Sequence, residues 1–165
     1  MEARDLAAVT EAALSEEFSV ALVEQPYRVR GRRAPAPAGQ LDAAWIAVVD
    51  HLRADELNGL ELVVGGRSLG ARVACRTVEQ TGAVAVLCLA FPLHPPGRPD
   101  RTRLPELEAV KVPVLVVQGE QDPFGMPPAG PQRTVAKVRG NHSLRSDLEA
   151  VAESVQTWLR YISSS

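Results

Sequence analysis

The stretch LELVVGGRSLGARVACR at residues 60–76 decides the fold, because it joins a strand to a helix through a very tight turn. Its first part, LELVVGG (60–66), is mainly apolar and is predicted to be a buried strand. Residues 66–70 (GRSLG) then follow the pattern G-x-S-x-G, which places a serine on the strand-to-helix turn. The flanking glycines, Gly66 and Gly70, are expected to let neighbouring backbone approach without clashes from a Cβ atom. The pattern alone would occur by chance in roughly one such chain in twenty, so its place between strand and helix carries the information.

Helical and strand patterns alternate along the rest of the chain. Apolar residues recur at steps of three and four in residues 2–16, in 41–52 and in the terminal segment, where Ser146 and Glu149 have the spacing of a capping box. Continuous apolar runs predict further strands at 18–24, 84–91, 112–119 and 134–140. Such alternation favours an α/β fold with a mostly parallel sheet and helices on both faces, as one domain over residues 1–165.

The composition is typical of a soluble globular protein, with 45% hydrophobic and 23% charged residues. A net charge of -2 gives no general attraction to nucleic acid or to an anionic membrane, and no apolar run approaches the ~20 residues that span a bilayer. The N-terminus lacks the pattern of a secretory signal, which predicts a cytoplasmic protein. Cys75 and Cys88 have no metal-ligand spacing and are expected to be buried thiols. Neither a metal nor a cofactor is expected.

Three chemically active residues follow predicted strands, where ligands of parallel sheets bind. Ser68, Asp122 and His142 each come directly after a different strand. Their order along the chain is the one expected for a nucleophile, acid and base on an α/β sheet. In such a triad the histidine takes the proton of the serine, and the acid fixes the imidazole tautomer. The backbone N–H of Leu69 is the expected donor to the oxyanion.

Each of these residues alone has an ordinary structural explanation. The GRSLG turn also suits a plain strand-to-helix connection or a phosphate-binding loop, although no lysine follows its glycines to grip a phosphate. Asp122 stands where it could simply initiate a Pro-Gly turn. Glu120 is the alternative acid, and His51 is a poorer candidate base because it lies on the polar face of a helix. It is the conjunction of Ser68, Asp122 and His142 that favours the triad.

Five longer stretches resemble the dienelactone-hydrolase-like branch of the α/β-hydrolase superfamily. The resemblance is greatest to a small family named after a mammalian testis-expressed protein and a subunit of a histone-acetyltransferase-associated complex. The stretches are VEQPYRV (23–29), VVGGRSLGARVACR (63–76), LAFPLHPPGR (89–98), VVQGEQDPFG (116–125) and RGNHSL (139–144). The resemblance implies a serine hydrolase that acts on a small ester, thioester or lactone. The chromatin-complex relative leaves open a second hypothesis, a non-catalytic binding module of the same fold.

Candidate substrate contacts lie within these stretches, at Gln25, Tyr27, Arg28, Arg67 and His94. Arg28 shares its loop with other arginines at positions 30, 32 and 33 and with no acid. Arginine side chains match the geometry of carboxylates and phosphates, so the loop either favours an anionic acyl substrate or is simply solvated. The expected partner is a small acyl substrate, with neither nucleic acid nor membrane, and a homodimer is left open.

One feature of the resembling family has no counterpart in this sequence. In that family a strand ending in His-Gly and a glycine-rich loop precedes the first helix and supplies a second oxyanion donor. The strand lies between those that correspond here to 18–24 and 60–66, yet this sequence starts at the helix. We therefore expect an N-terminally truncated sheet, and an apolar run ending in His-Gly or Gly-Gly encoded upstream of Met1.

Overall fold

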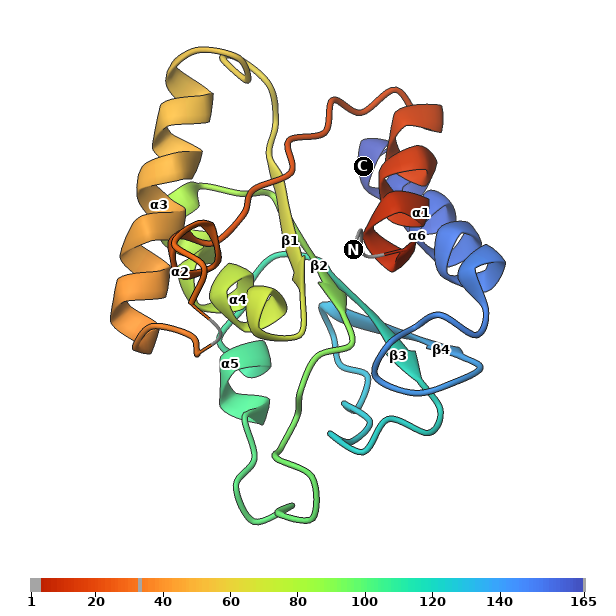
Figure 1. Ribbon diagram of the computed structural model, residues 1–165. Helices are drawn as coiled ribbons and strands as arrows, with labels where there is room; N and C mark the ends of the chain where they lie inside the picture. The colour runs from red at the N-terminus through yellow and green to blue at the C-terminus, as the bar shows by residue number, and fades with distance from the viewer. Residues whose placement is uncertain (1–3, 33, 165) are drawn as a thin grey trace.

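The computed structural model describes residues 4–32 and 34–164 (Figure 1). The elements in chain order are α1 (Arg4–Ser15), α2 (Pro26–Val29), α3 (Ala38–Ala54), β1 (Val63–Arg67), α4 (Leu69–Thr81), β2 (Ala85–Leu89), α5 (Leu104–Glu108), β3 (Val114–Gly119), β4 (Arg133–Val138) and α6 (Leu148–Ser163). Helices and strands alternate as predicted from α3 to β3, but among the described residues no strand lies between α1 and α3. Two short helices, α2 and α5, were not predicted.

The four strands form one parallel sheet in the order β1-β2-β3-β4. One row of residues shows the register of the sheet. Gly66 of β1 pairs with Cys88 of β2, Cys88 pairs with Val116 of β3, and Val116 pairs with Val135 of β4. Because all strands run the same way, their carboxyl ends lie along one edge of the sheet. The predicted α/β class with a parallel sheet is confirmed.

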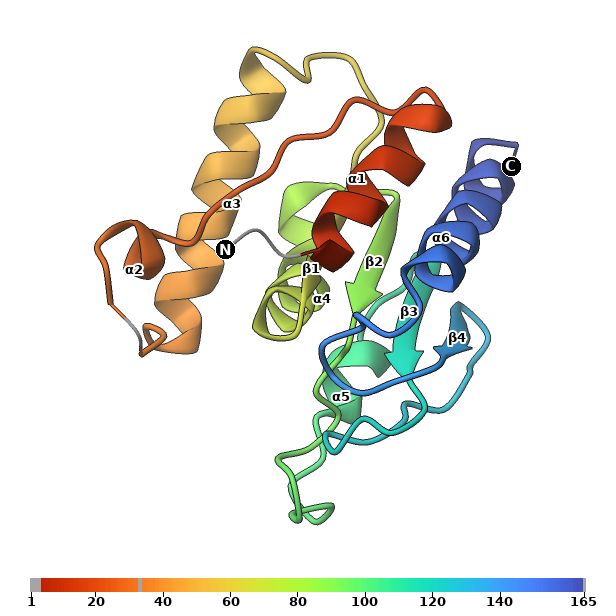
Figure 2. The same cartoon turned by 45° about the vertical axis from the view of Figure 1, so that its right-hand side comes forward.

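Helices cover both faces of the sheet, and each face has its own apolar core. On one face Val64, Val86 and Val116 pack with residues of α4 and α5, and α3 packs against α4. On the other face Leu115 and Val117 pack with residues of α1 and α6. Figures 1 and 2 show the two groups of helices on opposite sides of the strands. Each fully buried valine or leucine contributes roughly 1.5–3 kcal/mol relative to exposure, so these faces fix the orientation of the sheet.

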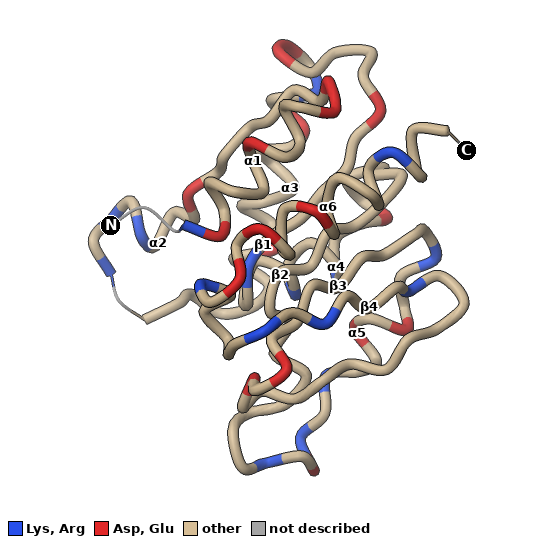
Figure 3. Tube along the Cα trace, turned by 90° about the vertical axis from the view of Figure 1, so that its right-hand side faces the viewer, with Lys and Arg blue, Asp and Glu red and all other residues tan. Residues whose placement is uncertain are grey.

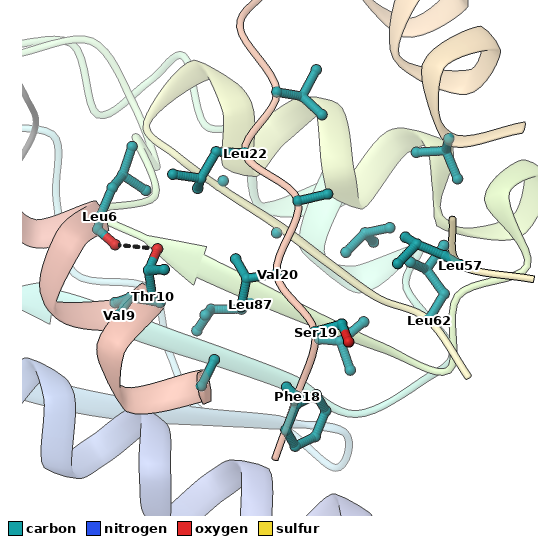
Figure 4. Close-up of a pocket in the computed structure, with 18 of the residues that line it drawn as sticks. Leu6, Val9, Thr10, Phe18, Ser19, Val20, Leu22, Leu57, Leu62 and Leu87 are labelled. Carbon is teal, nitrogen blue, oxygen red and sulfur yellow. Dashed lines mark hydrogen bonds between the residues drawn. The ribbon is translucent and has the colours of Figure 1, made fainter. Parts of the chain in front are cut away.

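Residues 18–24, predicted to be a buried strand, form no strand. The segment is extended, but Val20 and Leu22 are 38% and 68% exposed. A cavity of about 200 Å³ separates it from β1, with Leu6 of α1, Val20 of the segment and Leu62 before β1 among its lining (Figure 4). An apolar run becomes a strand only where its backbone groups meet those of a neighbour, and here the neighbour lies across the cavity.

The predicted cap of the terminal helix was wrong by one residue. Helix α6 starts at Leu148, and its N-cap is Asp147, whose carboxylate accepts a hydrogen bond from the N–H of Ala150 at 3.3 Å. Arg139 donates to the same carboxylate at 2.9 Å. This hydrogen bond, followed by that from the Ala150 N–H, lowers the pKa of Asp147. A carboxylate at the N-cap also complements the helix dipole, which explains why it takes the position that Ser146 was expected to hold.

Both cysteines are buried and free, with their sulfur atoms 3.5 Å apart. The contact with Cys75, together with burial, raises the pKa of Cys88 well above its ordinary value. These thiols therefore behave as small apolar side chains that join α4 to β2. Across the described ranges, no helix combines the length and the apolar character needed to cross a membrane.

Candidate active site

Ser68 stands on the turn between β1 and α4 in a backbone conformation that L-residues rarely adopt. Its φ is 53° and its ψ is -111°, a combination that typically costs about 1–3 kcal/mol. The turn depends on Gly66, where a Cβ atom would lie 2.4 Å from the carbonyl carbon of Gly70. Gly70 itself is different, because a Cβ there would have no heavy atom within 4 Å outside its own helix. The expectation that both glycines relieve a clash is thus met at the first position only.

A continuous chain of hydrogen bonds connects three side chains from three separate loops. The Oγ of Ser68 lies 2.9 Å from Nε2 of His142, and Nδ1 of His142 lies 2.8 Å from Oδ2 of Asp122. Ser68 follows β1, Asp122 follows β3 and His142 follows β4, so the parallel sheet brings them to one edge. The structure thus places the three predicted residues together, in the order that proton transfer from a hydroxyl requires.

Of the three hydrogen-bonded residues, Asp122 has a buried side chain, whereas the side chain of His142 is reached by solvent. The side chain of Asp122 is 1% exposed and that of His142 is 20% exposed. The N–H of Phe124 donates to Oδ1 of Asp122 at 2.9 Å, and the Phe124 ring lies on the imidazole with centroids 4.2 Å apart. Phe124 therefore shields the acid and orients the histidine at once, a role that the sequence analysis did not foresee.

Leu69 is the first residue of α4, so its N–H has no acceptor within the helix. It follows Ser68 directly and belongs to the end of the helix that favours negative charge. An oxygen atom that gains charge while bonded to Ser68 would find this donor nearby. The position agrees with the expected oxyanion role of Leu69.

Arg67, predicted as a substrate contact, forms two contacts within the protein. Its Nε is 2.7 Å from Oδ2 of Asp5, a residue of α1 that is only 1% exposed. Its Nη2 donates to the backbone carbonyl of His142 at 3.3 Å. One guanidinium thus connects the first helix and the histidine loop to the serine turn. Asp5 had no signal in the sequence, because it lies far from Arg67 along the chain and in a different element.

The other candidate residues lie outside the hydrogen-bonded chain. His94 packs on the turn after β3, where a Cβ at Gly125 would meet its ring atom Nε2. The backbone N–H of His94 donates to the backbone carbonyl of Phe124 at 3.0 Å. Glu120, the alternative acid, and His51, the competing base on α3, are both exposed. Among the described residues, no hydrogen bond joins any of these three to Ser68.

The remaining predicted contacts, Gln25, Tyr27 and Arg28, belong to α2 and its N-cap, beside α3 in Figures 1 and 2. Tyr27 helps to line a separate cavity of about 270 Å³ with residues of α3. Within the described ranges, no hydrogen bond links these residues to Ser68, Asp122 or His142. Arg33 lies outside the described residues.

Basic and acidic residues are interspersed along the trace rather than gathered in one band (Figure 3). In the part of the chain that the structure describes, no three His, Cys, Asp or Glu residues are grouped to hold a metal ion.

Sequence and structure comparisons agree with this architecture. The family model described as an α/β hydrolase domain matches residues 1–156, so the chain belongs to that family. Among solved structures, the chain is similar to an α/β serine hydrolase homologue from Coxiella burnetii, with 17% identity, a TM-score of 0.65, and coverage of 96% of this chain and 77% of that one. It is also similar to a member of the α/β serine hydrolases without a lid from Xanthomonas campestris, with 20% identity, a TM-score of 0.69, and coverage of 98% and 75%. At these identities the similarity shows the shared fold.

Proposed function

We propose that this protein is a serine hydrolase that cleaves a small ester, thioester or lactone through an acyl-enzyme on Ser68. The observation that carries the proposal is the hydrogen-bonded chain from Ser68 through His142 to Asp122, with separations of 2.9 and 2.8 Å. A serine nucleophile is activated when its hydroxyl lies within hydrogen-bonding distance of a base and a buried acid orients that base.

In the first half of the reaction, Nε2 of His142 accepts the proton of Ser68 as Oγ bonds to the acyl carbon. Asp122 accepts the hydrogen bond from Nδ1, which holds the imidazole in the tautomer that leaves Nε2 free to accept. The former carbonyl oxygen gains a negative charge, to which the N–H of Leu69 donates. When the tetrahedral intermediate collapses, His142 gives the proton to the departing alcohol or thiol.

In the second half, water replaces the leaving group. His142 takes a proton from the water molecule, whose oxygen attacks the acyl carbon bonded to Ser68. The intermediate then releases the carboxylic acid, and the proton returns from His142 to Oγ. In a lactone, acid and alcohol belong to one molecule, so a hydroxy acid would be the product.

The substrate class follows from the resemblance to the dienelactone-hydrolase-like branch, which we propose as the place of this chain within its family. The stretches at 63–76, 116–125 and 139–144 that carry the resemblance are also those that supply Ser68, Asp122 and His142.

The test is covalent labelling by a fluorophosphonate together with hydrolysis of p-nitrophenyl acetate. Ser68→Ala should abolish both, because it removes the only hydroxyl on the strained turn. Ser143→Ala is the matched control, since Ser143 is next to His142 but its hydroxyl bonds to Asn141 at 2.8 Å. Labelling that survives in Ser68→Ala would show that another residue is the nucleophile.

A non-catalytic binding module of the same fold is the second candidate, which the resemblance to the chromatin-complex subunit leaves open. The labelling experiment separates the two functions, because a binding module with the same fold would leave the probe unreacted in the unaltered protein.

A further inference from the structure

A single polar side chain is buried in the strand that leads to the acid. Gln118 stands in β3, where the residues before it, Val114–Val117, are all apolar, and it is 0% exposed. Its amide nitrogen Nε2 lies 2.8 Å from Oδ2 of Asp122, 2.8 Å from the carbonyl of Gly125 and 3.1 Å from the carbonyl of Phe91. One amide group therefore touches the acid, the turn that carries it and the end of β2.

The orientation of this amide follows from its neighbours. All three partners are oxygen acceptors, so only the NH2 end of Gln118 can face them, and the reverse orientation would set oxygen against oxygen. Oδ2 of Asp122 is the same oxygen that lies 2.8 Å from His142. With Phe124 N–H on Oδ1, the carboxylate accepts hydrogen bonds at both oxygens. Gln118 thus completes the set of donors that fixes the plane of the carboxylate.

Burial of Gln118 has a cost that packing alone does not explain. Among the described residues, its buried Oε1 has no hydrogen-bond partner, and a buried acceptor left unpaired is destabilising. An apolar residue of similar size would avoid this cost at Oε1 and would continue the apolar strand. Retaining an amide here is therefore best explained by what its nitrogen does for Asp122.

We propose that Gln118 is a positioning residue for the reaction, which holds Oδ2 of Asp122 in line with Nδ1 of His142. The inference rests on the proposed function. Gln118 does not touch the reacting atoms and acts through the acid. Its loss should allow the carboxylate to rotate away from the imidazole, which lowers the fraction of molecules in which His142 can accept the proton of Ser68.

Three variants test this role. Gln118→Met keeps the length of the side chain and removes the donor. By analogy with residues that orient metal ligands, its loss should lower kcat about 10- to 100-fold, while KM changes less than twofold. Thr81→Val is the matched control, because Thr81 is 1% exposed and its hydroxyl bonds only within its own helix, at the end far from Ser68. It should leave kcat unchanged.

The pH dependence of kcat in Gln118→Glu distinguishes a positioning role from a merely structural one. Two carboxyl groups in one buried site retain a shared proton to higher pH than either would alone. With that proton the glutamic acid can donate to Asp122, and without it the two groups repel. The kcat of Gln118→Glu relative to the unaltered protein should therefore rise as the pH falls. Because the shape is conserved, this variant also carries the test if Gln118→Met does not fold.

A measurement independent of turnover completes the experiment. The Nδ1 proton of His142, bonded to a carboxylate, should give a low-field proton NMR resonance that Thr81→Val retains and Gln118→Met loses. Equal kcat and equal resonances in these two variants, or a pH-independent ratio for Gln118→Glu, would overturn the role of Gln118. If the unaltered protein does not react with the fluorophosphonate, the proposed function itself fails. If it does react, but Gln118→Met keeps both the kcat and the resonance, only the role of Gln118 is refuted.

Discussion

Replacing Gly66 by alanine tests whether the serine turn is as tight as its geometry indicates. The new Cβ would lie 2.4 Å from the carbonyl carbon and 2.7 Å from the carbonyl oxygen of Gly70, whereas ordinary van der Waals contact starts at 3.4 Å. Relief of the overlap requires a shift of about 1 Å in backbone that cannot rotate away, as a side chain could. A displacement of this size at a reacting group can lower the rate about 100-fold, and overpacking typically costs about 1–3 kcal/mol of stability.

Gly70→Ala is the matched control on the same turn, because it adds a Cβ without a clash. Its Cβ would enter open space, and alanine is favoured over glycine within a helix by up to about 1 kcal/mol. The thermal midpoint should therefore rise by up to about 4 °C, with turnover within a few-fold of the unaltered protein. Gly66→Ala should instead lower both the midpoint and the rate.

The assay is the second-order rate of fluorophosphonate labelling, measured well below the unfolding midpoint of each variant, alongside thermal unfolding by circular dichroism. The labelling rate reports the geometry of Ser68 in folded protein and so separates misplacement from unfolding. Labelling of Gly66→Ala at the rate of the unaltered protein would refute the reasoning. An equal loss in both alanine variants would also contradict it, because the structure assigns the clash to one glycine alone.

Two further predictions concern the base and the helix cap. His142→Ala should lower p-nitrophenyl acetate turnover by several orders of magnitude, whereas His51→Ala should leave it nearly unchanged. Asp122→Asn should lower turnover by about 10⁴-fold, as in serine proteases whose histidine has the wrong tautomer. A larger loss in His51→Ala than in His142→Ala would be evidence against the proposed base. The lowered pKa of Asp147 means that its ionised form is favoured in the folded protein, so its stabilising contribution is present above the unfolded value near 4 and is lost as the pH falls through the folded value. Asp147→Asn should therefore lower the thermal midpoint at pH 7 but not near pH 2, and an equal loss at both would argue against an ionic cap.

The parts of the fold set by local pattern could be predicted from the sequence. β2 and β3 fall within predicted strands, and β1 and β4 each extend one residue beyond theirs. The agreement arises because apolar segments between helices are buried wherever a sheet is covered on both faces. The run at 18–24 has the same pattern and forms no strand. Whether such a run pairs depends on a neighbour elsewhere in the fold, and no pattern within the run can reveal that.

The candidate site shows the same division. Ser68, Asp122 and His142 could be proposed because each follows a strand and residue type alone suggests its chemistry. Gln118 left a weaker signal, as a lone polar residue at the end of an apolar strand, and its meaning depends on the turn that folds back over it. Asp5 left none, because its contact with Arg67 joins α1 to the serine turn across the sheet.

The position of β1 in the sheet makes the mobility of the site uneven. Within the described residues, β1 has a hydrogen-bonded neighbour on one side, β2, and the 200 Å³ cavity on the other, whereas β3 is paired on both sides. Strands held by a single ladder open locally more often than those held by two. Amide hydrogens of β1 should therefore exchange with solvent faster than those of β3. Ser68 follows the strand with one hydrogen-bonded neighbour, and Asp122 follows a strand with two. We therefore expect a group that fills the cavity to protect the amides of β1 from exchange more than those of β3.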